Sequence, residues 1–198
     1  NFMEAYHHMG AHRETLEPFL PAKGCWTEPY DEDFSVMHLP LRDDMKKEIL
    51  ASGDAGTTMT PFPSLKVEDY TEWWVYLGFP NFLIFNAPDR TYWYRLLPTG
   101  PETCSLLTTM LIHPSSKELS EYDSIFKSEV EAAIKFHLED MEVCGATQQG
   151  MRSLAYKRGR LSHLEEPIWH FQKYLASKMA VGTYKTLSLI HISEPTRP

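Results

Sequence analysis

The sequence contains few cysteines, and they lie far apart. Only Cys25, Cys104 and Cys144 occur in 198 residues, and no two of them form a Cys-x-x-Cys pair. Small secreted domains that depend on disulfides have an even number of closely spaced cysteines, so the sequence does not fit that class. We therefore expect a protein of a reducing compartment and predict a cytoplasmic location.

Long apolar runs and basic clusters are also missing. The run from Leu77 to Phe85 is interrupted by Gly78, Pro80 and Asn81, and it is shorter than the ~20 residues that a membrane-spanning helix needs. The net charge is −8 and the acidic residues are spread along the chain, so no basic surface is expected to bind phosphate groups. The sequence predicts neither a membrane nor a nucleic-acid partner.

Neither end of the sequence has the character of a natural terminus. The chain opens at Asn1 without an initiating Met or a signal-peptide pattern, so we expect further residues upstream. Residues 187–198 resemble the translation of a sequencing-library adapter, and we expect a non-native tail there, the alternative being a natural polar tail. The length suits a single domain, which we place at residues 1–186.

Periodicity and turn residues predict an α+β fold, because a block of strands is followed by helices. Helices are expected at 1–17, 43–51 and 117–148, and a last one from the capping box of Ser162 and Glu165 to about Met179. Strands are expected at 33–41, 73–78, 82–86, 91–97 and 104–113, as an antiparallel meander with turns at 88–89 and 98–101. The Gly- and Pro-rich stretch 53–64 is expected to be a loop that lines or covers a site. On the last helix, Ile168, Phe171 and Leu175 should face the sheet.

The most unusual segment is residues 1–12, which hold three histidines and Glu4. Two imidazoles and one carboxylate on one face of an octahedron leave positions open for dioxygen, as Fe(II)-dependent oxygen activation requires. The imidazole pair could be His8 and His12, which share a face of a regular helix. It could equally be His7 and His12, about 140° apart, if the helix is distorted near Gly10. Helix geometry alone does not choose between these pairs.

Four motifs in the same order resemble the catalytic domain of ring-hydroxylating oxygenase large subunits, which are Rieske-type non-haem iron oxygenases. The first is Asn-Phe-x-Glu-x-Tyr-His-x-x-x-x-His at residues 1–12, and the second is Phe-Pro-Asn at 79–81. Leu-Pro-Thr-Gly-Pro at 97–101 is the third, and Glu139-Asp140 followed by Gln-Gln-Gly-Met-Arg-Ser at 148–153 is the fourth. The family has Gln-Arg-Gly where this chain has Gln149-Gly150, and Gly145 replaces a commoner acidic residue. The resemblance covers roughly residues 1–180 and implies a helix-grip (START-like) fold, with a curved antiparallel sheet and a long C-terminal helix.

The resemblance also implies roles for individual residues. His7, His12 and Asp140 would bind one mononuclear Fe(II), and Glu4 would connect the iron site to the cluster of a neighbouring subunit. Asn1, Phe2, Tyr6 and His8 would lie in the substrate pocket or behind the iron ligands.

A two-iron two-sulfur Rieske cluster is implied as well, but the Cys-x-His and Cys-x-x-His pairs that bind it do not occur in this sequence. They would lie in an N-terminal domain upstream of Asn1, and the fragment alone is expected to be inactive. Other implied partners are a reductase or ferredoxin as electron donor and further copies of the full-length subunit, in a homotrimer or hetero-oligomer.

The resemblance implies an oxygenase that hydroxylates an aromatic or related organic substrate. One alternative is a monooxygenase for quaternary ammonium compounds, with a cation–π cage drawn from aromatic residues on the strands. The candidates are Trp73, Trp74, Tyr76, Tyr92, Trp93 and Tyr94. Alternating aromatics also pack sheets, and that is the more common role. An alternative of another class is a metal-free helix-grip module that binds an apolar ligand.

Overall fold

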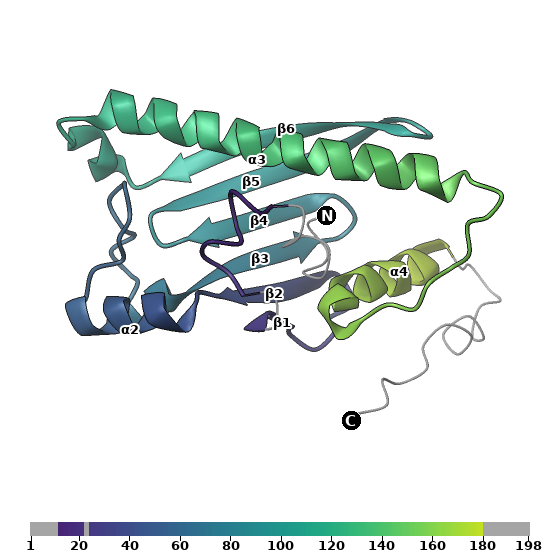
Figure 1. Cartoon of the computed structure of the whole chain (residues 1–198), viewed down its shortest axis with the longest axis horizontal. Helices are drawn as coiled ribbons and strands as arrows, with labels where there is room; N and C mark the ends of the chain where they lie inside the picture. The colour runs from purple at the N-terminus through teal and green to yellow at the C-terminus, as the bar shows by residue number, and fades with distance from the viewer. Residues whose placement is uncertain (1–11, 22–23, 180–198) are drawn as a thin grey trace.

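A computed structural model describes residues 12–21 and 24–179. Its centre is a six-stranded antiparallel sheet in which each strand pairs with the next along the chain, in the order β1-β2-β3-β4-β5-β6 (Figure 1). The strands are β1 (Trp26–Thr27), β2 (Phe34–Pro40), β3 (Glu72–Gly78), β4 (Phe82–Ala87), β5 (Arg90–Gly100) and β6 (Thr103–Ile112). The predicted meander is confirmed, and the fold class is α+β as expected.

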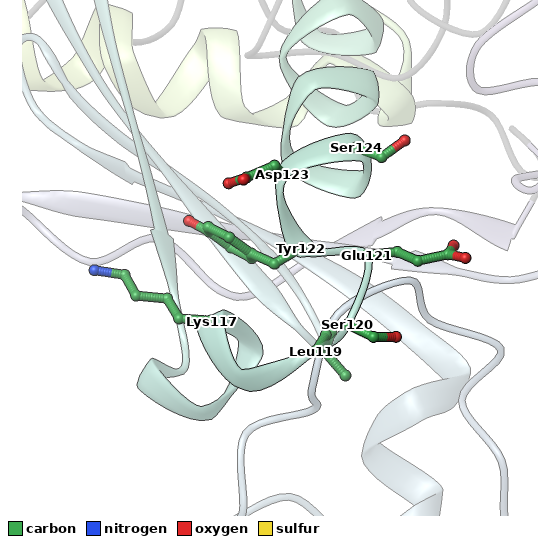
Figure 2. Close-up of a pocket in the computed structure, with 7 residues that line it drawn as sticks. All are labelled: Lys117, Leu119, Ser120, Glu121, Tyr122, Asp123 and Ser124. Atoms are coloured by element: carbon green, nitrogen blue, oxygen red, sulfur yellow. The ribbon is translucent and has the colours of Figure 1, made fainter.

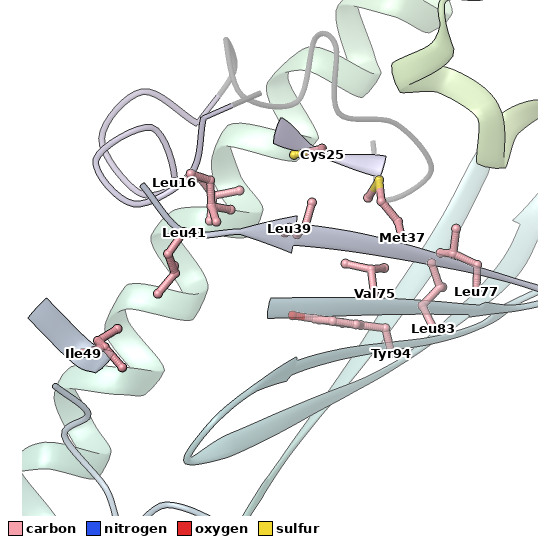
Figure 3. Close-up of a cluster of buried hydrophobic side chains, with 11 residues drawn as sticks. Leu16, Cys25, Met37, Leu39, Leu41, Ile49, Val75, Leu77, Leu83 and Tyr94 are labelled. Carbon is pink, nitrogen blue, oxygen red and sulfur yellow. The ribbon is translucent and has the colours of Figure 1, made fainter. Parts of the chain in front are cut away.

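Alternation along the strands gives the sheet an inner face and an outer face. The inner side chains include Met37, Val75, Leu77 and Leu83, which are buried in one apolar cluster (Figure 3). Cross-strand pairing keeps them on the same face, because Met37 lies opposite Val75, and Leu77 opposite Leu83. The core of the domain therefore lies between the inner face and the elements that cover it.

The long hairpin of β5 and β6 corrects one predicted turn. We expected the chain to turn at 98–101, but β5 continues to Gly100 and the turn is formed by residues 101 and 102. The strand register shifts between Pro98 and Gly100. A proline is tolerated in a strand at such an irregularity, since it has no N–H for a regular ladder.

The longest helix of the described chain is α3 (Tyr122–Met151), which runs along the β5–β6 side of the sheet (Figure 1). It begins five residues later than predicted, because the 3-10 turn η3 (Pro114–Glu118) precedes it. The predicted C-terminal helix is present, although it is shorter than α3. The last described helix, α4 (Glu166–Met179), has 14 residues and α3 has 30.

Helix α4 packs on β2 and on the turn after β3, and it starts at the predicted capping box. Ser162 Oγ accepts from Leu164 N at 3.2 Å, and Glu165 Oε2 accepts from Ser162 N at 2.7 Å within the 3-10 turn η4 (His163–Glu165). The buried face differs from the one that we predicted. Pro167 and His170 are buried while Ile168 and Leu175 are only half-buried. Phe171 does face inward, against Phe79 with a ring distance of 5.5 Å.

The remaining segments lie before and between the strands of the sheet. Helix α2 (Asp43–Ser52) ends at Gly53, whose φ of 73° is a left-handed conformation that favours glycine, and an irregular loop follows as predicted. The 3-10 turn η2 (Val67–Thr71) leads into β3. Residues 13–19 form successive turns rather than the α-helix expected to continue to residue 17. Within the described ranges, no helix is both long and apolar enough to span a membrane.

Candidate metal centre

The imidazole of His12 is completely buried against α3. The turn after it is closed by the backbone of Leu16, which donates to the His12 carbonyl at 2.9 Å. Leu16 belongs to the apolar core (Figure 3), and so does Leu20. Burial of these two leucines holds the turn in place. The N-terminal segment thus presents a histidine to a helix more than a hundred residues away in the sequence.

Two consecutive acidic residues of α3 contact the two nitrogens of this ring. His12 Nε2 lies 2.9 Å from Asp140 Oδ1, and His12 Nδ1 lies 2.7 Å from Glu139 Oε2. The Thr15 hydroxyl donates to the same Glu139 oxygen at 2.8 Å. Asp140 is the buried residue of α3, whereas Glu139 is partly exposed. The ring is therefore fixed at both nitrogens.

Aromatic rings enclose the same place. Phe136 stacks on the face of His12 with 4.1 Å between the centroids and 11° between the planes. The rings of His137 and Tyr94 are nearly perpendicular, with 5.2 Å between their centroids. His137 Nδ1 lies 3.6 Å from Asp140 Oδ2. Sequence reasoning missed Phe136, His137 and Glu139. These residues precede Asp140 by four, three and one positions, which places them on or beside the helix face that carries Asp140. That spacing was the signal in the sequence that could have indicated them as neighbours of the site.

The surroundings shift two protonation equilibria. Burial alone lowers the pKa of His12, but hydrogen bonds to Asp140 and Glu139 outweigh it, and the pKa is raised above its usual value. Burial raises the pKa of the Tyr94 hydroxyl, and the nearby charge of Asp140 acts in the same direction. Tyr94 is therefore a neutral phenol at physiological pH.

The described side chains include two of the three donors that a first-row metal such as Fe(II) would need here. Fe(II) in this type of site takes two imidazoles and one carboxylate, and His12 and Asp140 are one of each, with their donor atoms adjacent. A metal-binding histidine normally donates its other N–H to a carboxylate or carbonyl, and Glu139 occupies that position. Within residues 12–21 and 24–179, no group of three or more His, Cys, Asp or Glu side chains is arranged to hold a metal ion.

The remaining predicted site residues lie outside the described residues. They are Asn1, Phe2, Glu4, Tyr6, His7 and His8. The structure brings together His12 and Asp140, and the place of His7 in the predicted triad stays a prediction.

The six candidate cage aromatics divide between the two faces of the sheet. Trp73, Tyr92 and Tyr94 pack with the inner core, while Trp74, Tyr76 and Trp93 are on the outer face. Trp74 donates to Glu72 Oε1 at 2.6 Å on that outer face. Half of the candidates are therefore on the side of the sheet that lacks His12 and Asp140.

Tyr94 connects the metal-site residues to a row of inner aromatics. The ring centroids of Tyr92 and Tyr94 are 6.1 Å apart, and those of Phe85 and Tyr92 are 6.2 Å apart. Trp73 continues the row at 5.5 Å from Phe85. Trp73, Phe85 and Tyr92 are only half-buried although they are on the inner face, so part of each ring is open to solvent on the metal-site side of the sheet.

A hollow at the start of α3 is separate from this site (Figure 2). It has a volume of about 590 Å³ and is lined by Lys117, Leu119, Ser120, Glu121, Tyr122, Asp123 and Ser124. Asp140 follows Asp123 by seventeen residues on the same helix, which corresponds to about 26 Å at 1.5 Å per residue. The hollow therefore belongs to another part of the surface.

Comparison with known proteins decides the family. The catalytic domain of the ring-hydroxylating alpha subunit matches residues 1–181. The chain belongs to this family. The expected resemblance is thus confirmed, and so is the α+β fold with its antiparallel sheet.

Relatives of this chain include two chloroplastic choline monooxygenases. That of Arabidopsis thaliana is 30% identical over 93 residues, which are 47% of this chain and 21% of the relative. That of Atriplex hortensis is 27% identical over 151 residues, 74% of this chain and 33% of the relative. The chain therefore matches between a fifth and a third of the length of these relatives.

Solved structures show the same fold. A quaternary ammonium Rieske monooxygenase, described in connection with carnitine oxidation by gut microbiota and inter-subunit electron transfer, aligns with a TM-score of 0.62 at 20% identity. The alignment covers 89% of this chain and 44% of that one. The quaternary ammonium Rieske monooxygenase CntA in complex with an inhibitor aligns with a TM-score of 0.55 at 17% identity, with the same coverage.

Proposed function

We propose that this alpha-subunit domain is the oxygen-activating part of a Rieske-type monooxygenase for a quaternary ammonium compound. One Fe(II) would be bound by His7, His12 and Asp140. The observation that carries this proposal is the buried contact of His12 Nε2 with Asp140 Oδ1 at 2.9 Å, between residues 128 positions apart. The family membership supports the same assignment, because these are two of the three residues that the family motifs indicate.

The side chains at this place suit oxygen chemistry. When bound, Fe(II) supplies open coordination positions and the redox chemistry for dioxygen. His12 presents Nε2 and Asp140 presents a carboxylate oxygen. Both side chains are buried, with Phe136 stacked on the imidazole, and this burial keeps bulk water away from them. The Tyr94 hydroxyl keeps its proton because burial raises its pKa.

The substrate class rests on relatives and on the aromatic row. Sequence alone favoured ring hydroxylation, but the curated relatives are named as choline monooxygenases. We infer that the half-buried rings of Trp73, Phe85 and Tyr92 receive the ammonium group, since aromatic faces attract cations.

The three described cysteines are free thiols, which supports the further proposal of a cytoplasmic protein.

The same proposal includes an electron supply. A two-iron two-sulfur cluster outside this chain would receive electrons from a reductase or ferredoxin, and Glu4 would connect it to the iron site of a neighbouring full-length subunit. We place the domain at residues 1–186, and the proposed non-native tail 187–198 lies outside the described residues.

The metal site is tested by reconstituting the chain with Fe(II) under anaerobic conditions and measuring bound iron. We expect one tightly bound Fe(II) per chain, and loss of it in His12→Ala and in Asp140→Ala. His163→Ala is the matched control, because His163 is an exposed histidine on the turn before α4. Equal iron content in all four proteins would contradict the site.

The substrate class is tested by calorimetry on the Fe(II)-loaded chain with choline and with its neutral isostere 3,3-dimethylbutan-1-ol. A desolvated cation–π contact is worth about 2 kcal/mol, so choline should bind roughly 30-fold more tightly. Trp73→Leu should remove most of that difference, and Trp74→Leu on the outer face should not. Tighter binding of naphthalene than of choline would instead favour ring hydroxylation.

A further inference from the structure

Glu139 has a position that the proposed iron ligands do not explain. Its Oε2 accepts from two donors of the N-terminal turn, the Nδ1 side of His12 at 2.7 Å and the Thr15 hydroxyl at 2.8 Å. The hydroxyl therefore orients the carboxylate toward the ring. The next residue, Asp140, contacts the opposite nitrogen of the same ring.

The two nitrogens of a neutral imidazole have different functions. One nitrogen carries the proton, and the other has the lone pair that can bind a metal. An acceptor that hydrogen-bonds to one nitrogen holds the proton there, so the other nitrogen becomes the metal-binding one. An ionised carboxylate only accepts hydrogen bonds. In the structure Nε2 also hydrogen-bonds to Asp140, so a metal that binds there has to displace the Nε2 proton. With Glu139 at Nδ1, the remaining proton is held on Nδ1 and the Nε2 lone pair is free for the metal beside Asp140.

We infer that Glu139 is a positioning residue, which fixes the Nδ1–H tautomer of His12 and thereby directs Nε2 to the metal. This inference rests on the proposed function, because it assigns the role of a residue behind one of the proposed ligands. Glu139 is not itself placed to bind the metal, since it contacts the ring nitrogen on the other side. The stacked Phe136 ring limits rotation of the imidazole, so Glu139 has to fix only which nitrogen carries the proton.

The experiment compares metal affinity in three variants of the full chain. Co(II), a spectroscopic substitute for Fe(II), is titrated into Glu139→Ala, Glu139→Gln and Glu142→Ala under anaerobic conditions. Loss of an outer hydrogen-bond partner typically weakens metal affinity ~10–100-fold, and we expect that loss in Glu139→Ala. Glu139→Gln should recover part of it, because its amide oxygen can still accept from Nδ1–H. Glu142 is an exposed carboxylate one turn further along α3, so Glu142→Ala controls for the loss of charge and should bind normally.

A second measurement reports on the proton itself. In protein loaded with diamagnetic Zn(II) and labelled with ¹⁵N-histidine, the His12 Nδ1–H proton should resonate far downfield and exchange slowly with water. It is assigned through its loss in His12→Gln. The resonance should move upfield in Glu139→Gln, a change that a merely structural role would not produce. This variant keeps the shape of the side chain and removes only its charge, so it decides the matter even if Glu139→Ala fails to fold.

The two levels of the proposal fail in different ways. If the parent chain binds no Co(II), the metal site is wrong and the role of Glu139 falls with it. If the parent chain binds Co(II) and Glu139→Ala binds it within about threefold, with the Nδ1–H resonance unchanged in Glu139→Gln, only the positioning role is overturned.

Discussion

The side chain of His170 should make the fold sensitive to mild acid. It is completely buried between α4 and β2, with Nδ1 2.9 Å from Ser35 Oγ. Its Nε2 lies 3.7 Å from Glu166 Oε1, which is too far for a hydrogen bond. Burial, with a further contribution from the positive charge of Lys173, lowers the pKa of His170 to about 4. The imidazole is therefore neutral in the folded protein at pH 7.

The sign and size of the effect follow from proton linkage. Between the unfolded pKa of 6.5 and the folded pKa of about 4, the unfolded chain binds a proton that the folded chain does not. Stability is therefore present above this window and is lost as the pH falls through it. From about pH 7 to pH 5, we expect His170 to remove roughly 1–2 kcal/mol of the free energy of unfolding.

Glu166 acts in the opposite direction, so the measurement must be a difference. Burial raises its pKa, and the folded state then retains a proton that the unfolded chain releases. Urea unfolding near pH 7 and near pH 5 should be followed for the parent chain and for His170→Gln. We expect a smaller loss of stability at the lower pH in His170→Gln. The exposed His163→Gln serves as the control and should behave like the parent chain. Equal losses in the parent and in His170→Gln would refute the reasoning.

Two further predictions concern the histidine pair and the start of α4. His7→Ala should abolish Fe(II) binding, while His8→Ala should keep most of it, with at most the ~10–100-fold loss typical of residues behind the ligands. Equilibrium dialysis distinguishes them, and the reverse result would favour the His8 and His12 pair. Ser162→Ala should lower the free energy of unfolding by about 1 kcal/mol, because it removes the cap on Leu164 N. Ser177→Ala, at an exposed position of α4, should have little effect, and equal results for the two serines in urea unfolding would contradict the capping role.

The sheet could be predicted from the sequence because its signals are local. Strand β2 alternates apolar and polar residues over much of its length, and β3 is a short aromatic-rich run. Turn residues separate the later strands. The predicted ends of the strands were less accurate where a residue type occurs both in turns and at irregular positions within strands. Pro98 is typical of a turn, but in the structure it lies at an irregularity within β5.

The candidate site could be predicted only in part, since its contacts join distant segments. The order of motifs indicated His12 and Asp140, and the structure brings them together. Glu139 and His137 were missed because their roles depend on how α3 is turned toward the sheet. His170 was missed for a related reason. A single histidine on an amphipathic helix has no local signal of burial, and only the packing of α4 on β2 encloses it.

The site depends above all on the rotation of α3 about its own axis. Residues 136 and 140 are one turn apart, so Phe136 and Asp140 share a face, and Glu139 is displaced by 100°. All three contact one imidazole, and turning the helix by one residue would break every contact. An ion pair in the first half of the helix and another just after its last residue oppose such a rotation. Glu129 pairs with Arg90 at the start of β5, and Arg152 pairs with Glu102 in the β5–β6 turn. The long hairpin therefore contacts α3 on both sides of the residues that surround the buried His12 ring.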